Sequence, residues 1–477
     1  MKKGIFFLVL LAFIGNCSIA RNLKGKVFCS GKGLSGVVVG GGVVVTDGIN
    51  CTVTDKNGEY QLNTDSTSDF VFIVTPSGYI ASYATGTPCF YKSVSAHNHD
   101  FELYEYSVPQ GTYTMFAVGD TQPGSDHDYE RLEKEGFPDL KSYGEEYREK
   151  NIPVAAILLG DMVYDNQETY GRFKDNLRRL GFPVYPVIGN HDHEEYFDNG
   201  QKSELVYKQF FGPNYYAFNM GRDYYIVLDN IDYRGNRQYD ERITQIQLEW
   251  VKKYVEYIPK GSQVFVAMHA PAYIYYLPER VMGGAKEIMD ILKDYKVSIL
   301  SGHTHIHSNL KLRPNVREHM IASIGGAWWL GNCKYTYDGT PMGYQVFEST
   351  PSGLQWHYKT LGKPRNYQFK VYPIGTFPGH TNELCIKVWN WDEGWKVEWK
   401  EDGKDKGEMK SFPSIDPDYT WYLNRSAADG TLNLKGTKPQ ENAYAFFAAT
   451  PAADSKTIEI IVTDRFGNKY VQLVSNK

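Results

Sequence analysis

The chain has 477 residues, of which 42% are hydrophobic and 22% charged, and its formal net charge is -5. Because a single hydrophobic core rarely grows to this size, the length predicts two or three globular domains. The slightly negative net charge gives no positive electrostatic potential that would attract a nucleic-acid backbone, so we expect no nucleic-acid binding.

The N-terminus has the pattern of a secretory signal peptide. Lys2-Lys3 precedes an apolar run over residues 5–14, and Ser18-Ile19-Ala20 supplies small residues at the cleavage positions. The run is shorter than the roughly 20 residues that a transmembrane helix needs, and no later stretch qualifies. We therefore expect residues 1–20 to be removed and the protein to be exported to the periplasm or cell surface. Lipid anchoring through Cys17 is the alternative.

Five cysteines would remain after cleavage, and an odd number allows at most two disulfides. They are Cys29, Cys51, Cys89, Cys333 and Cys385. Cys29 and Cys51 lie in the same predicted domain and are the favoured pair. Buried thiols that pack as small apolar groups are an equal alternative.

Residues 21–106 predict an all-β domain. Short β-branched runs alternate with turn signals, and the Asn-Gly of Thr54-Asp-Lys-Asn-Gly58 suits a tight hairpin turn. The layout GKV…GLSGVVV…VTDKNGEYQL over residues 23–63 resembles that of the carboxypeptidase regulatory domains. The resemblance implies a small immunoglobulin-like β-sandwich without catalytic residues.

Residues 107–362 predict a layered α/β domain, because short apolar strands alternate with amphipathic stretches. Six strands are expected over residues 113–118, 154–159, 184–188, 224–228, 264–268 and 297–300. Helices are expected between them. One covers residues 243–257, with an apolar face formed by Ile243, Ile246, Val251 and Val255.

Five of these strands are followed immediately by polar residues that can bind metals. They are Asp120 and Gln122, Asp161, Asn190 with His191 and Asp192, His269, and His303 with His305. In layered α/β sheets the carboxyl ends of the strands form the edge where ligands bind. Each motif alone is an ordinary loop, but five at the same end predict a metal site. Carboxylate, amide and imidazole ligands suit Mn²⁺, Zn²⁺ or Fe.

The ordered pattern Gly-Asp, Gly-Asp-x-x, Gly-Asn-His-Asp, lone His and Gly-His-x-His over residues 112–310 resembles the calcineurin-like metallophosphoesterases. That resemblance implies a four-layer α/β/β/α sandwich holding two divalent metal ions. Asp161 would bridge the ions. The other ligands would form two groups, Asp120 and His305 for the first metal, and Asn190, His269 and His303 for the second. His191 would act as the acid near the leaving group, oriented by Asp192.

The first motif departs from the family pattern, because Asp120-Thr121-Gln122 replaces Asp-x-His. Some family members have Asp-x-Gln, so we expect the amide oxygen of Gln122 to be a ligand of the first metal. Tyr164 stands where purple acid phosphatases place a tyrosinate on ferric iron, and we expect it to be a neutral neighbour of the site. Trp328 and Trp329 either stack on a substrate or belong to the core.

Residues 363–477 predict a second small β-sandwich, which loosely resembles the C-terminal module of exported bacterial phosphoesterases. Four tryptophans there are expected to pack between strands, with a sugar-binding face as the alternative: Trp389, Trp391, Trp395 and Trp399.

Together these features predict an exported phosphoesterase that hydrolyses a small phosphorylated substrate by in-line attack of a metal-bridging hydroxide. One alternative is an iron enzyme of the purple acid phosphatase type that uses Tyr164. Another is an inactive surface glycan-binding protein. The residues leave the choice among monoester, diester and pyrophosphate open, and they give no indication of the oligomeric state.

Overall fold

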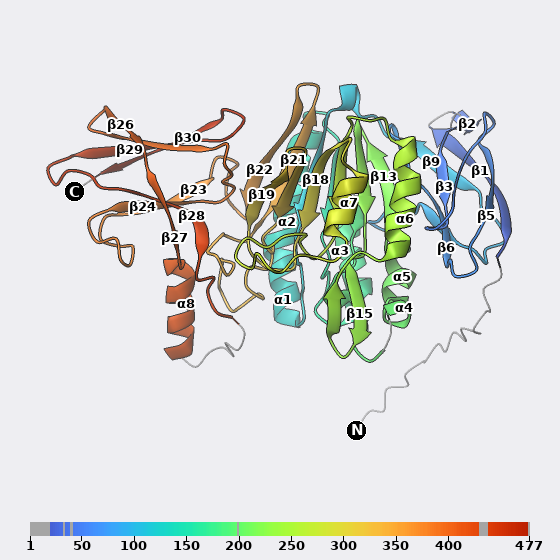
Figure 1. The fold of residues 1–477 in the computed structure, drawn as a ribbon, viewed down its shortest axis with the longest axis horizontal. Helices are drawn as coiled ribbons and strands as arrows, with labels where there is room; N and C mark the ends of the chain where they lie inside the picture. Colours follow the sequence, from blue (N-terminus) through green and yellow to red (C-terminus); the bar gives the residue numbers. More distant parts are fainter. Residues whose placement is uncertain (1–19, 32–33, 39–41, 198–199, 429–436, 476–477) are drawn as a thin grey trace.

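The computed structural model describes residues 20–31, 34–38, 42–197, 200–428 and 437–475. The predicted signal peptide, including Cys17, lies outside these ranges except for Ala20. Within them, every helix is too short or too polar to cross a membrane. Figure 1 shows the central α/β layers between an N-terminal and a C-terminal β-rich domain.

Two sheets form the middle of the molecule. The first has the order β12-β11-β10-β21-β22, with bounds Val184–Pro186, Val154–Leu158, Tyr113–Val118, Gly343–Thr350 and Gly353–Thr360. The second has the order β13-β14-β17-β18-β20-β19, with bounds Tyr216–Met220, Asp223–Val227, Gln263–Ala267, Lys296–Ser301, Val316–Met320 and Ser308–Arg313. Strands β10, β11 and β12 run parallel, as do β14, β17, β18 and β20. All six predicted strands are present.

Side chains of β10 alternate between two cores, as the pleat of a strand requires. Met115 and Ala117 face the second sheet, whereas Phe116 and Val118 belong to an outer core with the helices. Across the two sheets, the ring centroid of Phe265 on β17 lies 5.5 Å from that of Phe347 on β21. The predicted four-layer α/β/β/α sandwich is therefore confirmed.

The outer layers consist of short amphipathic helices. Against the first sheet lie α1 (Asp126–Arg131), α2 (Phe137–Arg148) and α3 (Tyr170–Leu180). Against the second lie α6 (Gln245–Tyr254) and α7 (Ala285–Ile291) (Figure 1). The predicted apolar face of the 243–257 helix was partly wrong. Ile246 is 54% exposed, because α6 begins after Thr244 and buries the side of Leu248, Val251 and Tyr254.

The N-terminal domain is a sandwich of two small sheets. One has the order β2-β1-β9-β7 with β5 paired to β1, and its bounds are Leu34–Val38, Asn22–Gly31, Phe101–Glu105, Tyr79–Ala81 and Glu59–Asn63. The other has the order β4-β3-β6-β8, with bounds Cys51–Val53, Val44–Thr46, Phe70–Ile73 and Tyr91–Ser93. In this described part of the chain Cys51 forms no disulfide with Cys29, and its thiol donates a hydrogen bond to Thr46 Oγ1 at 3.6 Å.

The C-terminal domain is a second sandwich. Its sheets are β23-β24-β28-β27 and β26-β25-β29-β30, with bounds Phe369–Tyr372, Leu384–Val388, Ala443–Ala449, Lys410–Ser414, Lys404–Glu408, Lys396–Glu401, Thr457–Thr463 and Lys469–Ser475. Trp389, Trp395 and Trp399 are buried, which supports their expected packing role. The domain also carries α8 (Pro417–Ala428), where the hydroxyl of Tyr422 donates to the carbonyl of Leu330 at 2.8 Å. The two flanking sandwiches are thus present, and the boundaries at residues 106 and 362 stay predictions.

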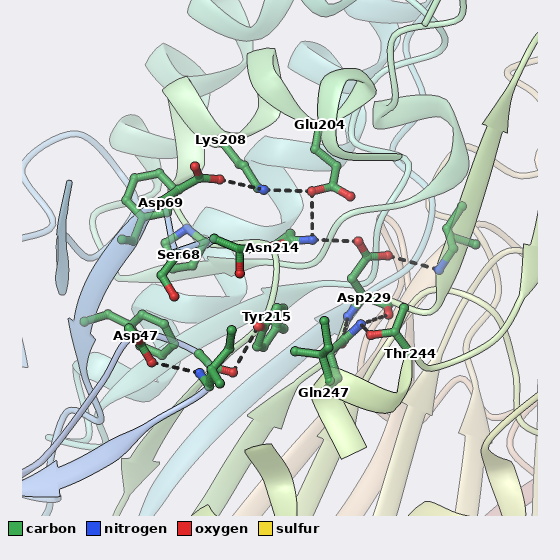
Figure 2. Close-up of a pocket in the computed structure, with 18 of the residues that line it drawn as sticks. Asp47, Ser68, Asp69, Glu204, Lys208, Asn214, Tyr215, Asp229, Thr244 and Gln247 are labelled. Atoms are coloured by element: carbon green, nitrogen blue, oxygen red, sulfur yellow. Dashed lines mark hydrogen bonds and ion pairs between the residues drawn. The ribbon is translucent and has the colours of Figure 1, made fainter. Parts of the chain in front are cut away.

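A polar cluster joins the N-terminal domain to the central layers around a cavity of about 200 Å³ (Figure 2). Lys208, on α5 (Leu205–Phe211), lies 3.1 Å from the carboxylate of Asp69 and 2.9 Å from that of Glu204. The amide of Asn214 donates to both Glu204 and Asp229. One ammonium group therefore neutralises a buried carboxylate and ties two domains together.

We predict that Lys208→Met destabilises the protein by about 3–5 kcal/mol, because it leaves the buried Glu204 without its cation. Urea unfolding followed by circular dichroism measures the change. As a control, Lys252→Met removes an exposed ammonium that pairs with Glu249 at 2.6 Å, and its midpoint should equal that of the wild type. An unchanged midpoint for Lys208→Met would contradict the structural role of the cluster.

Candidate metal centre

The carboxyl ends of five strands, two from one central sheet and three from the other, deliver the predicted ligands to one place. Around Asp161, which follows β11, His269 Nε2 lies 3.2 Å from Oδ2 and 3.0 Å from Asn190 Oδ1. His303 Nδ1 lies 3.0 Å from His269 Nε2. One ligand atom from each of Asp161, His269 and His303 falls within 4.8 Å of the others. The group expected for the second metal is therefore assembled.

The group expected for the first metal also contacts Asp161. His305 Nε2 is 3.6 Å from Asp120 Oδ1, and the amide of Gln122 donates to Asp161 Oδ2. Asp161 Oδ1 accepts the backbone N–H of His191 at 2.8 Å. Asp161 thus touches residues of both groups, as a bridging ligand must.

Five of the seven proposed ligands have left-handed backbone, with φ between 37° and 69°: Asp120, Gln122, Asp161, His303 and His305. Non-glycine residues adopt this conformation at a cost, and such residues cluster at functional sites. The turns after β10, β11 and β18 therefore hold these ligands at the expense of local backbone strain.

The glycines before the ligands are required by close approach. A Cβ on Gly189 would lie 2.3 Å from Asp161 Oδ1, and a Cβ on Gly302 would lie 2.6 Å from Asp120 Oδ2. Any side chain at these positions would push a buried carboxylate aside. In the Gly-Asn-His-Asp and Gly-His-x-His motifs, the glycine thus leaves room for a buried carboxylate, and the residues after it include the expected ligands.

The donor set fits a pair of metal ions. Gln122 Oε1 and His305 Nε2 are buried, and neither has a hydrogen-bond partner among the described residues. Leaving a buried acceptor atom without a partner costs folding free energy. Burial raises the pKa of Asp120 to about 8. Burial by itself would lower the pKa of His269, but the adjacent Asp161 raises it to about 10. Nearby positive charge therefore stabilises the buried carboxylates, and divalent cations would supply such charge.

The structure corrects the expected partner of His191. Its Nδ1 lies 2.8 Å from Asp165 Oδ1, not against Asp192. In the 3₁₀ turn Asn190–Asp192 the carboxylate of Asp192 folds back, accepting the N–H groups of Gly189 and Met162 and the hydroxyl of Tyr170. Asp192 therefore shapes the loop, and Asp165 orients the histidine.

The three aromatic residues that the sequence suggested near the site, Tyr164, Trp328 and Trp329, differ in their surroundings. The ring of Tyr164 lies against that of His191, with centroids 4.4 Å apart, and burial raises the pKa of its phenol, which favours the neutral form. Trp328 is half-buried, and its ring centroid lies 4.9 Å from that of His305. Trp329 is 2% exposed and donates its indole N–H to the carbonyl of Thr121 at 2.7 Å. Of the two alternatives for Trp329, its burial favours core packing over stacking on a substrate.

Sequence reasoning missed several residues that hold the ligands in place. Asn230 Oδ1 accepts the backbone N–H of His269 at 3.1 Å. The fully buried Glu318 accepts the N–H groups of Ala272 and Tyr273 and the hydroxyl of Ser301. A charged residue inside the buried strand β20 was the one signal that could have revealed it. Glu241 and Arg237 also contact residues of the site.

Three family models match consecutive parts of the chain. The model of the calcineurin-like phosphoesterases covers residues 113–307. Models described as the N terminal and the C terminal of calcineurin-like phosphoesterase cover residues 21–106 and 318–470. The chain belongs to the calcineurin-like phosphoesterase family. Enzymes of this family use a dinuclear divalent metal centre.

Similarity to individual members of the calcineurin-like phosphoesterases is distant. A probable glycerophosphodiester phosphodiesterase of Arcobacter nitrofigilis is 24% identical over 163 residues, which are 33% of this chain and 58% of that protein. The chain thus matches under two thirds of that relative's length. A purple acid phosphatase from yellow lupin (Lupinus luteus) seeds has a TM-score of 0.38 at 11% identity, covering 67% of each chain. A dimetal phosphatase from Danio rerio has a TM-score of 0.34 at 11% identity, covering 51% of this chain and 98% of that one.

We predict that Asp192→Ala lowers the free energy of unfolding by about 3 kcal/mol or more, because three donors lose their acceptor at about 1–3 kcal/mol each. Thermal unfolding measures the effect. Asp126→Ala, which changes an exposed carboxylate in the same domain, should leave the midpoint unchanged. Lower activity at full stability for Asp192→Ala would instead restore its expected role as the partner of His191.

Proposed function

We propose that the protein is an exported phosphoesterase that uses two divalent metal ions, Mn²⁺, Zn²⁺ or Fe, to hydrolyse small phosphate esters. The observation that carries this is the position of Asp161, a buried carboxylate in contact with both ligand groups. When bound, two such ions would make hydroxide available at neutral pH and neutralise the phosphate. Manganese and export rest on the donor chemistry and on the N-terminal pattern, respectively.

The ligand roles divide between two groups that both contact Asp161. Asp120, Gln122 and His305 would hold the first ion, with Gln122 contributing its amide oxygen. Asn190, His269 and His303 would hold the second. The second set is anchored by main-chain contacts, since His269 Nδ1 lies 2.7 Å from the carbonyl of Leu159. That bond fixes the ring and leaves Nε2 facing the other ligands.

His191 would hold the proton that the leaving oxygen needs. Its Nδ1 faces Asp165, so its Nε2 is the atom able to donate to the departing alkoxide. The ring packs against Tyr164 and Trp328, whose ring centroids lie 4.4 Å and 5.8 Å from it. General acid catalysis of this kind typically contributes 10²- to 10⁴-fold.

The substrate class is tested by comparing esters that differ in charge and number of ester bonds. The resemblance to a probable glycerophosphodiester phosphodiesterase supports including phosphodiesters. Hydrolysis of p-nitrophenyl phosphate and bis-p-nitrophenyl phosphate, followed by a panel of sugar phosphates, nucleotides and phospholipid headgroup diesters, is measured on protein of known metal content. Metal-loaded protein that hydrolyses none of them would overturn the proposal.

We predict that Asn190→Ala and His191→Ala fail in different ways. Asn190→Ala should lose metal, because it removes a ligand atom. His191→Ala should keep both ions and lose about 10²- to 10⁴-fold in kcat, because it removes only the proton donor. Plasma emission analysis and steady-state kinetics on the same preparations check both outcomes. An empty site in His191→Ala would show that the roles are wrongly assigned.

We also predict that Gln122→His binds the first metal more tightly than the wild type, since imidazole is a stronger donor than an amide oxygen. Competition with a chelator measures the two dissociation constants. Equal affinities would rule out the expectation that an amide at this position weakens retention of the first metal.

A further inference from the structure

A two-stranded hairpin outside both central sheets reaches the proposed metal site from one side. It consists of β15 (Ile231–Gly235) and β16 (Gln238–Glu241), and it connects β14 to α6 (Figure 1). The ring of Tyr233 on β15 stacks on that of His193 with centroids 4.7 Å apart. The hairpin is therefore packed against the loop that carries Asn190 and His191.

The base of the hairpin contacts a proposed metal ligand. Glu241 Oε1, at the end of β16, lies 3.1 Å from His303 Nε2, and its side chain is 8% exposed. Arg280 donates its Nε–H to the other oxygen of the carboxylate at 3.1 Å. The opposite nitrogen of His303, Nδ1, faces His269 among the ligand atoms. A carboxylate that accepts the second N–H of a metal-binding histidine fixes both its tautomer and its orientation.

The tip of the hairpin contacts the partner of His191. Arg237 Nη2 lies 2.7 Å from Asp165 Oδ2 and 3.4 Å from Glu195 Oε2. A backbone hydrogen bond also holds the tip against this loop, because Asn236 donates its N–H to the carbonyl of Glu195 at 2.9 Å. Asp165 Oδ1 faces His191 Nδ1. A guanidinium on one oxygen of Asp165 thus leaves the other oxygen aimed at the histidine.

We propose that the β15–β16 hairpin is a positioning element for the reaction, in which Glu241 holds His303 for the metal and Arg237 holds Asp165, and through it His191, for the leaving group. This inference rests on the proposed function. In this role neither residue needs to touch the substrate. Because the two contacts serve different histidines, their loss should produce two separable defects.

For the base, metal binding is the readout. Glu241→Ala should weaken retention of one of the two ions by about 10- to 100-fold, the usual effect of removing a carboxylate behind a metal ligand. Glu241→Gln keeps an acceptor and should restore part of the affinity. Asp240→Asn is the matched control, because Asp240 is the adjacent carboxylate on β16 and pairs with the exposed Arg234. Wild-type affinity for both ions in Glu241→Ala would overturn this half of the proposal.

For the tip, the leaving group is the readout. Arg237→Ala should keep both ions and lose about 10-fold or more in kcat on a phenyl ester, but little on a 2,4-dinitrophenyl ester, whose leaving group needs no proton. Arg237→Lys should recover part of the rate, and Arg234→Ala should match the wild type. Equal losses on the two esters would overturn the assignment of Arg237.

A double variant tests whether Arg237 acts through His191. In the His191→Ala background, Arg237→Ala should cause no further loss on the phenyl ester, since the group that it positions is absent. An additive loss would mean that Arg237 acts elsewhere. If the wild type holds two ions and turns over esters while these variants match it, the hairpin proposal alone fails. If the metal-loaded wild type is inert, the proposed function fails.

Discussion

The structure depends on burying two carboxylates, Asp120 and Asp161, next to each other where both central sheets end. A buried carboxylate is costly unless donors or cations surround it, and two in contact also repel each other. Here the surrounding groups come from five strand ends, with backbone N–H groups of His191 and His303 and the imidazole of His269 directed at them. Parallel strands make this possible, because their carboxyl ends meet at one edge.

The flanking domains contact the central layers in different places. The N-terminal sandwich packs against α6, where the indole of Trp250 donates to Thr46 Oγ1 at 3.1 Å. The C-terminal domain lies nearer the site, because Tyr422 on α8 holds the carbonyl of Leu330 beside the half-buried Trp328. Trp328 in turn contacts His191 and His305. The C-terminal domain therefore helps to position a wall of the site.

The β15–β16 hairpin contacts two parts of the site, a proposed metal ligand and the partner of the proposed proton donor. Its base contacts the proposed metal ligand His303 through Glu241, and its tip contacts the proposed proton donor His191 through Arg237 and Asp165. The paired strands place both contacts on one element. In the proposed reaction, metal retention and leaving-group protonation would therefore share one scaffold.

The sequence by itself determined the six strands, the four-layer fold and the motifs that follow five strand ends, because each motif is a contiguous turn that ends a buried strand. It did not determine which carboxylate faces His191, since that depends on the direction in which Asp192 folds within its turn. Nor did it separate the buried Trp329 from the half-buried Trp328. Tertiary structure alone decided these points and the contacts of the hairpin, because the partners meet only after the two sheets and the loops between them have packed.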